Sequence, residues 1–223
     1  MDKTTASTVA ASSSGKPVPT RHGAGRPRAE EVEARLQALL QTAGELFIKH
    51  GYGKVSLEMI ARQARVAVRT IYVKFGGKAG MVAAMIEAKR GAYMSAHALI
   101  SDARPVVEVL GEFARGLHRL LHAPESQALR HMIAAEGKDN PELVEAFYKA
   151  GPGITLELLG RYFERTEVRA QLREDLPFEQ LPTFFTNCVI GDTLARMLDR
   201  PQHDESIAAL DARMALFFRA VLR

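Results

Sequence analysis

Apolar side chains recur at three- and four-residue spacing along most of the chain after residue 28, and this spacing predicts α-helices. The predicted fold class is therefore all-α. A Gly-Pro-Gly sequence at 151–153 must bend or interrupt one of the helices. The predicted helices cover residues 29–51, 57–64, 68–75, 78–101, 106–122, 124–136, 141–163, 178–198 and 205–222.

Residues 56–75 have the layout of a helix-turn-helix. Ser56 suits an N-cap, because its hydroxyl can accept from a free backbone N–H one turn further on. After a turn at 65–67, the second helix has Ile71 and Phe75 on its inner face. Its outer face suits entry into the DNA major groove, although an ordinary helical hairpin would share the layout. That face carries Val68, Arg69, Thr70, Tyr72 and Lys74.

These patterns divide the chain into three regions. Residues 1–28 are rich in small and polar residues without apolar periodicity, so we expect a disordered basic arm. Residues 29–78 predict a three-helix DNA-binding head, and residues 79–223 a larger helical body. We expect a cytoplasmic protein, because residues 1–25 lack a secretory apolar core and Cys188 is the single cysteine. No run of 18 apolar residues predicts a membrane span.

Charge is distributed unevenly between the two ends of the chain. Residues 1–80 contain 13 Lys and Arg against 6 Asp and Glu, whereas residues 81–223 contain 17 against 20. A basic front and a mildly acidic back favour a polyanion-binding head on a body that does not bind polyanions. Arg26 and Arg28 end the arm, where guanidinium groups can enter the adjacent minor groove. A solvated linker is the alternative for this stretch.

A set of positions in the head falls in a fixed order and spacing: Ala43, Leu46-Phe47, Gly51-Tyr52, Ser56, Ile60-Ala61, Ala64, Val66, Ile71-Tyr72, Phe75 and Lys78. Through these positions the head resembles the TetR family of transcriptional regulators over about residues 30–82. Through residues 132–143 and Phe147-Tyr148, the body more weakly resembles the multidrug-efflux repressors of that family.

The resemblance implies roles for individual residues. Ser56 and Lys78 match phosphate-binding positions, Val68, Arg69 and Thr70 match positions near base edges, and Tyr72 and Lys74 match contacts to phosphates or bases. The physical chemistry agrees, because Arg can grip guanine through two hydrogen bonds while the Thr and Val methyls meet thymine methyls. Tyr and Lys supply phosphate contacts that position the helix.

Three departures from the family pattern concern the start and the end of the second short helix. Arg65 occupies a turn position usually held by Gly, so a positive φ there would strain it, and it adds a charge beside DNA. Ala67 replaces the usual side-chain cap, worth roughly 1 kcal/mol. Gly76-Gly77 replaces the more usual polar cap before Lys78.

The last two predicted helices carry an apolar surface wider than one neighbouring helix covers. We expect part of it to meet a second subunit in a twofold four-helix arrangement, although burial inside a larger monomeric bundle would also explain it. The residues expected at this dimer interface are Phe184, Cys188, Leu210, Met214, Phe217, Phe218 and Val221.

The predicted function is a ligand-responsive, sequence-specific regulator, a repressor that binds a palindromic DNA operator as a homodimer and leaves it when a small apolar or amphipathic effector binds. No enzyme activity, cofactor, metal or membrane partner is predicted; His118 and His122 share a helix face without an evident third ligand. The alternatives are a helical small-molecule binder that has lost DNA affinity and an architectural DNA binder without an effector. The helix faces suggest an effector cavity lined by Phe113, Leu117, Met132, Phe147 and Tyr162.

Overall fold

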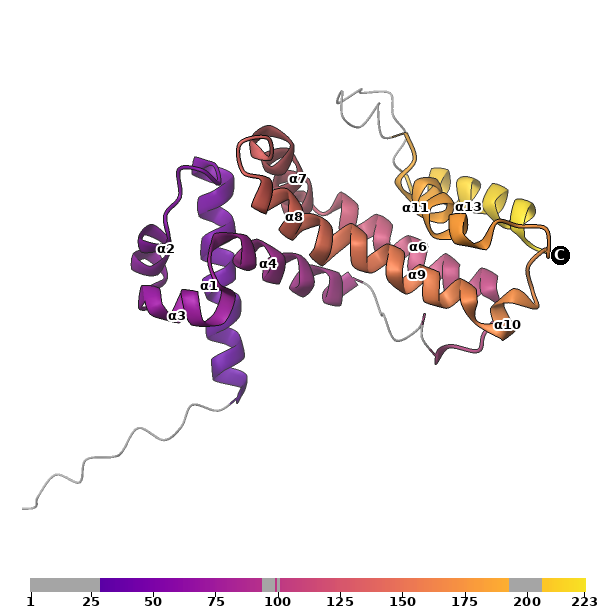
Figure 1. Cartoon of the computed structure of the whole chain (residues 1–223), viewed down its shortest axis with the longest axis horizontal. Coiled ribbons are helices and arrows are strands. Elements are labelled where there is room, and N and C mark those ends of the chain that lie inside the picture. The colour runs from indigo at the N-terminus through magenta and orange to yellow at the C-terminus, as the bar shows by residue number, and fades with distance from the viewer. Residues whose placement is uncertain (1–28, 94–98, 100, 193–205) are drawn as a thin grey trace, which may run out of the picture.

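The computed structural model describes residues 29–93, 99, 101–192 and 206–223, and these are built from helices (Figure 1). No helix in these ranges is both long and apolar enough to cross a membrane. The helices are α1 (Ala29–His50), α2 (Leu57–Ala64), α3 (Val68–Phe75), α4 (Lys78–Tyr93), α6 (Val106–His122), α7 (Pro124–Glu136), α8 (Pro141–Tyr148), α9 (Ile154–Glu164), α10 (Thr166–Arg169), α11 (Leu181–Ile190) and α13 (Ile207–Val221).

Most predicted helices are confirmed, and the predicted interruption at Gly151-Pro152-Gly153 is a π-helical segment, Lys149–Gly153, between α8 and α9. The prediction of a helix over 178–198 was wrong at both ends. A 3₁₀ turn, Phe178–Gln180, precedes α11, which ends at Ile190 because Gly191 adopts φ 74° and ψ −144°. Residues 193–198, like the predicted extension of α4 through 94–98 and 100, lie outside the described residues.

The head packs around fully buried aromatic and aliphatic side chains of α1, α2 and α3, among them Phe47, Ile60 and Ile71. Its apolar cluster continues past the predicted boundary at Lys78 into Met81, Val82 and Ile86 of α4, and includes residues of α7 and α8. In Figure 1, α4 runs from the head along the body. Because the head shares its core with these helices, a movement of the body can reach α3 through packing.

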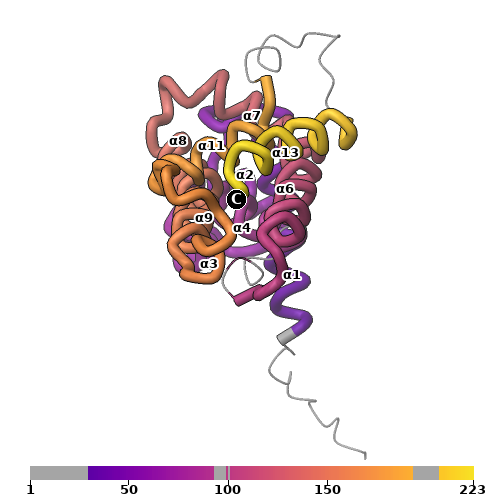
Figure 2. The backbone as a smooth tube through the Cα atoms, turned by 90° about the vertical axis from the view of Figure 1, so that its right-hand side faces the viewer, coloured from indigo at the N-terminus to yellow at the C-terminus, as the bar shows by residue number. Residues whose placement is uncertain are grey.

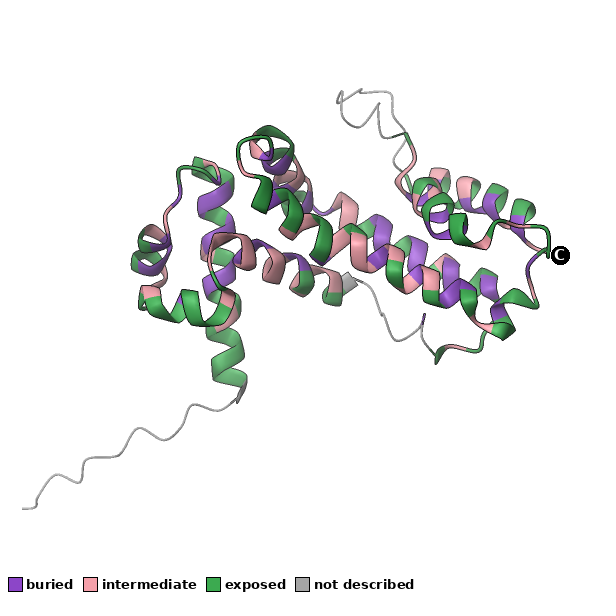
Figure 3. Ribbon diagram, viewed as in Figure 1, coloured by how far each residue is buried: buried purple, intermediate pink, exposed green. Residues whose placement is uncertain are grey.

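The body is a bundle in which α6, α9, α11 and α13 surround a second apolar cluster (Figure 2). Figure 3 shows buried residues along the facing sides of α6 and α9 and exposed ones on their outer sides. An antiparallel bridge between Leu172 and Leu222 helps to hold the chain's last residues, and Arg223 Nε donates to the Leu172 carbonyl at 2.8 Å. Arg173 N–H donates to the Val221 carbonyl at 2.9 Å.

The structure corrects the predicted dimer interface. Leu210, Met214, Phe217 and Val221 of α13 are buried within the subunit itself, at 0–4% exposure, so they are not available to a partner. Their stripe packs against α6 and α11, whose apolar faces are wide enough to cover it. Of the remaining predicted interface residues, Phe184 is 43% exposed, and Cys188 and Phe218 are half-buried.

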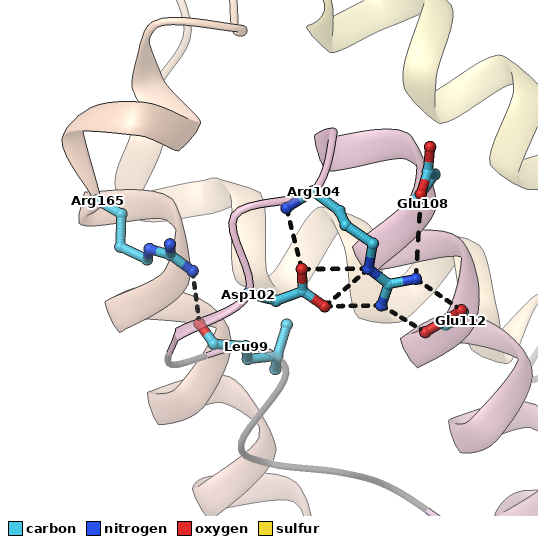
Figure 4. A network of polar contacts seen from close by, with 6 residues as sticks. All are labelled: Leu99, Asp102, Arg104, Glu108, Glu112 and Arg165. Atoms are coloured by element: carbon cyan, nitrogen blue, oxygen red, sulfur yellow. Dashed lines mark hydrogen bonds and ion pairs between the residues drawn. The ribbon is translucent and has the colours of Figure 1, made fainter.

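The chain before α6 is held by a charged network (Figure 4). Arg104 donates to Asp102 at 2.6 Å and to Glu112 at 2.8 Å, while Arg165 donates to the Leu99 carbonyl at 3.4 Å. Arg104 holds the pKa values of the Asp102 and Glu112 carboxyls below their usual ranges. Arg104 and Glu112 are exposed and Asp102 is half-buried, so the network stabilises the connection only modestly.

Candidate nucleic-acid interface

The first helix of the motif, α2, begins as the sequence predicts. Ser56 is its N-cap, and its Oγ accepts from Met59 N–H at 3.2 Å. Glu58 lies in the first turn, where its own backbone N–H and then the Ser56 hydroxyl hold the pKa of its carboxyl below the usual range. Leu57, Ile60 and Ala61 face the core.

The turn between α2 and α3 confirms the expectation for Arg65. Its φ is 55° and its ψ 43°, and it is the one described non-glycine residue with positive φ. The left-handed conformation closes α2, because the next residue, Val66, donates its N–H to the Ala61 carbonyl at 2.9 Å. Ala67 is the N-cap of α3 without a side-chain hydrogen bond. The turn therefore exposes an arginine beside an uncapped helix N-terminus.

One side of α3 faces solvent (Figure 3). Ile71 is fully buried, and Val68, which sequence reasoning placed outside, is half-buried against the head core. Val73, which was not predicted to lie on the outer face, is 75% exposed. It lies three residues after Thr70 and four after Arg69, and this spacing could have placed it on their face of the helix. The exposed residues of α3 are Arg69, Thr70, Tyr72, Val73 and Lys74.

An open groove of about 620 Å³ lies beside α3. It brings together the predicted residues Ser56, Tyr72 and Lys78 and adds Lys54, which sequence reasoning did not select. The first residues of both α2 and α4 line it, so two helix N-termini lie at the groove. Such ends present free N–H groups and a positive partial charge, which suit an anion such as phosphate.

Lys78 makes structural contacts, while its phosphate contact stays a prediction. Its Nζ donates to the Tyr52 carbonyl at 2.7 Å and lies 4.3 Å from the centre of the Tyr52 ring. Burial, followed by the nearby Glu142 carboxylate, raises the pKa of the Tyr52 phenol well above its usual range. An ammonium has three donors, so Lys78 keeps others for the groove.

A carboxylate from the body holds the same loop. Glu136, the last residue of α7, accepts from Tyr52 N–H at 2.9 Å and from Gly53 N–H at 2.7 Å. The loop approaches so closely that a Cβ on Gly51, whose φ is 86°, would overlap a Glu136 oxygen. Residues 52 and 136 are far apart in the chain, so no local pattern could reveal this contact between head and body.

We expect Glu136→Ala to lower the free energy of unfolding by about 1–3 kcal/mol, because two loop N–H groups lose a charged acceptor. The loop leads directly to Ser56, so operator affinity should fall as well. Glu164→Ala, at an exposed site on α9, is the control and should change neither. Denaturant unfolding and DNA titration measure the two effects; equal behaviour of both variants would contradict a role for this contact.

Comparison with known proteins places the motif in a family. Residues 39–85 match the family described as bacterial regulatory proteins, tetR family, and residues 108–220 match the AefR-like transcriptional repressor, C-terminal domain. The chain belongs to the TetR family. It is thus a transcriptional regulator with a DNA-binding helix-turn-helix, as the resemblance implied.

Three TetR-family proteins share about a quarter of their residues with this chain over the matched part. The regulator SrpR of Pseudomonas putida is 25% identical over 122 residues, which span 53% of this chain and 54% of SrpR. Among solved structures, the flavonoid-responsive regulator FrrA is 25% identical with a TM-score of 0.64, covering 85% of this chain and 98% of FrrA. NalD, the secondary repressor of the MexAB-OprM multidrug efflux pump in Pseudomonas aeruginosa, is 24% identical with a TM-score of 0.65, covering 86% and 98%.

The body contains an apolar cavity, and only two of the five residues predicted to line an effector site are found in its walls. Leu117 and Phe147 line it. Phe113 and Tyr162 lie in the body core, where burial raises the pKa of Tyr162 to about 12, and Met132 lies in the head core. A helix stripe predicts burial, but whether a buried side chain meets another side chain or an empty space depends on the opposing helices.

The remaining candidates are the histidine pair considered for metal binding and the two arginines of the N-terminal arm. The rings of His118 and His122 stack with centroids 3.9 Å apart, and no group of three or more potential metal ligands occurs in the described part of the chain. Arg26 and Arg28 lie outside the described residues, so the minor-groove role of the arm stays a prediction.

Proposed function

We propose that this TetR-family regulator is a repressor that binds a palindromic operator as a homodimer and releases it when a small molecule occupies the body cavity. The observation that carries the proposal is the exposed face of α3, which stands beside a groove bordered by two helix N-termini. That arrangement suits a helix inserted into a major groove while phosphates occupy the sites beside it.

Within this proposal, the contacts to DNA divide by chemistry. Arg69 reads guanine, and Thr70 and Val73 offer methyl groups to thymine. Ser56, Tyr72, Lys74 and Lys78 contact phosphates and set the position of α3. Arg65, held at the turn, adds a positive charge at the edge of the interface, and Val68 contributes through its exposed part.

A twofold dimer would pair the two copies of α3 with two half-sites. The outer face of the α11 and α13 pair supports such a contact: Phe184 is 43% and Leu216 66% exposed. Helical spacing places Ala209, Ala212 and Ala220 on the same face as Leu216. These alanines leave room for another helix beside Leu216, between Arg213 and Arg219 on either side, so this face replaces the predicted one centred on Leu210 and Phe217.

The response to a small molecule is supported by the cavity and by the path from it to the head. Two similar proteins are the flavonoid-responsive regulator FrrA and the repressor NalD. Here α4 borders the cavity at one end and begins at Lys78, which bonds the Tyr52 loop, at the other. A ligand that prefers one position of α4 would change the spacing of the heads and weaken operator binding by its differential affinity.

The direct test selects bound duplexes from a random DNA pool at two salt concentrations. We expect a palindrome that survives the higher salt. Arg69→Ala should then weaken that site by about 1–3 kcal/mol and relax base preference at one position of each half-site. Lys74→Ala, on the same helix, is the matched variant: it should weaken all sequences alike and lower the salt slope by about one.

Different outcomes would support the competing functions. An architectural protein would recover unrelated sequences that are lost at higher salt, and a helical small-molecule binder without DNA function would recover none. An unchanged base preference in Arg69→Ala would contradict the proposed orientation of α3.

A further inference from the structure

The cavity of the body is small and almost entirely apolar. Its volume is about 120 Å³, it is partly open to solvent, and its walls come from α4, α6, α7, α8, the π-helical segment, α9 and α11. Engineered apolar cavities of about 150 Å³ bind benzene, so this one suits a single ring. The apolar side chains in its walls include Leu117, Leu120, Leu121, Leu129, Phe147 and Ile190.

The charged groups of the lining all have one sign. Lys89, Arg90 and Arg130 border the cavity, and no Asp or Glu is among its lining residues. Lys89 lies 3.4 Å from the Glu125 carboxylate outside the lining, and Arg130 donates to the Leu121 carbonyl at 2.7 Å. The cavity is therefore electrostatically suited to an anion rather than to a cation.

Arg90 differs from the other two. Its Nε atom is buried and meets no hydrogen-bond acceptor in the described part of the chain. A buried charged donor without a partner is costly, and a ligand that supplies an acceptor removes that cost. The Thr155 and Thr186 hydroxyls, which also line the cavity, donate to the Gly151 and Pro182 carbonyls. Arg90 is thus the lining residue whose buried donor meets no acceptor in the described part of the chain.

We propose that the cavity binds a compact apolar monocarboxylate of about the size of benzoate, with its ring among the leucines and its carboxylate on Arg90. A guanidinium matches a carboxylate through paired N–H donors, and the apolar surroundings strengthen this charge-assisted contact. The volume within the walls fits one ring. This inference rests on the proposed function for its regulatory meaning, but the binding itself does not.

The position of Arg90 on α4 connects this site to the head. The carboxylate would act on the same helix whose first residue, Lys78, holds the Tyr52 carbonyl. Gly151 and Pro152 of the π-helical segment form part of the cavity wall, and π-helical turns often occur at functional sites. A ligand in the cavity would therefore contact two elements, α4 and the junction between α8 and α9.

The test compares three molecules of nearly equal shape: benzoate, benzamide and benzamidine, which carry charges of −1, 0 and +1. Calorimetric titration of the full chain without DNA should show benzoate binding at least about tenfold tighter than benzamide, and benzamidine weakest. Arg90→Met should remove the preference for benzoate while leaving benzamide binding unchanged. Arg161→Met, at an exposed arginine of α9, should match the unaltered protein.

Arg90→Lys keeps the charge and should keep part of the preference, which guards against a folding defect in Arg90→Met. Equal affinity for the three molecules, no binding of benzoate, or an unchanged preference in Arg90→Met would overturn the inference.

Operator binding is measured separately, with and without benzoate. Binding of benzoate that leaves the operator complex intact would support the site and overturn benzoate-driven release in the proposed function. Release of the operator by another small molecule, with no benzoate binding, would support the proposed function and overturn this inference.

Discussion

Phe217→Ala should lower the free energy of unfolding by about 3–5 kcal/mol, the usual cost of deleting a large buried aromatic side chain. Phe217 is fully buried, and its ring centroid lies 5.3 Å from that of Phe184, 5.4 Å from that of Phe185 and 5.6 Å from that of Phe218. Alanine would leave a cavity at the centre of this aromatic group, where α11 and α13 meet.

Leu216→Ala, at the adjacent residue, separates subunit packing from dimerisation. Leu216 is 66% exposed, so its truncation should change the stability of the subunit by no more than about 0.5 kcal/mol. If α13 meets a second subunit through this face, Leu216→Ala should instead raise the dimer dissociation constant. Denaturant unfolding at several protein concentrations, with analytical ultracentrifugation, distinguishes the two effects because only dimer dissociation depends on concentration.

The outcomes test the proposed dimer face of α13. A small, concentration-independent loss in Phe217→Ala, or a loss in Leu216→Ala as large as that in Phe217→Ala, would contradict the assignment of Phe217 to the subunit core and Leu216 to the dimer face.

Gly80→Ala should destabilise the protein by about 3 kcal/mol, the upper part of the usual range for overpacking. A Cβ at Gly80 would overlap the carbonyl oxygen of Phe75. That oxygen belongs to the backbone at the end of α3, so it cannot move aside as a side chain would. The junction must open, α3 must shift, and operator affinity should fall more than about tenfold.

Gly91→Ala is the matched control on the same helix. Among the described residues, no atom outside the backbone of this helix turn lies within 4 Å of a Cβ at Gly91, and alanine favours helix over glycine by about 1 kcal/mol. The control should therefore be slightly stabilised and bind the operator normally, so the two substitutions should have opposite signs. Thermal unfolding and DNA titration measure them. A Gly80→Ala variant with unaltered stability and affinity would contradict the close approach of α4 to α3.

Local signals were sufficient for much of the head. Ser56 caps α2, Arg65 takes the positive φ and Ala67 leaves α3 uncapped, because capping and turns depend on residues a few positions apart. The same signals were less reliable within α3, where Val68 proved half-buried and Val73 exposed. With only eight residues in α3, a small error in helix orientation moves side chains between its faces.

The sequence by itself determined the all-α class, most helix boundaries and the TetR family, because these follow from periodicity and from motifs read along the chain. The tertiary structure decided the rest. It buried Leu210, Met214, Phe217 and Val221 of α13 inside the subunit, joined Glu136 to the Tyr52 loop, and left an apolar cavity beside Arg90. Each of these depends on which distant helices meet, and a helix stripe carries no information about its partner.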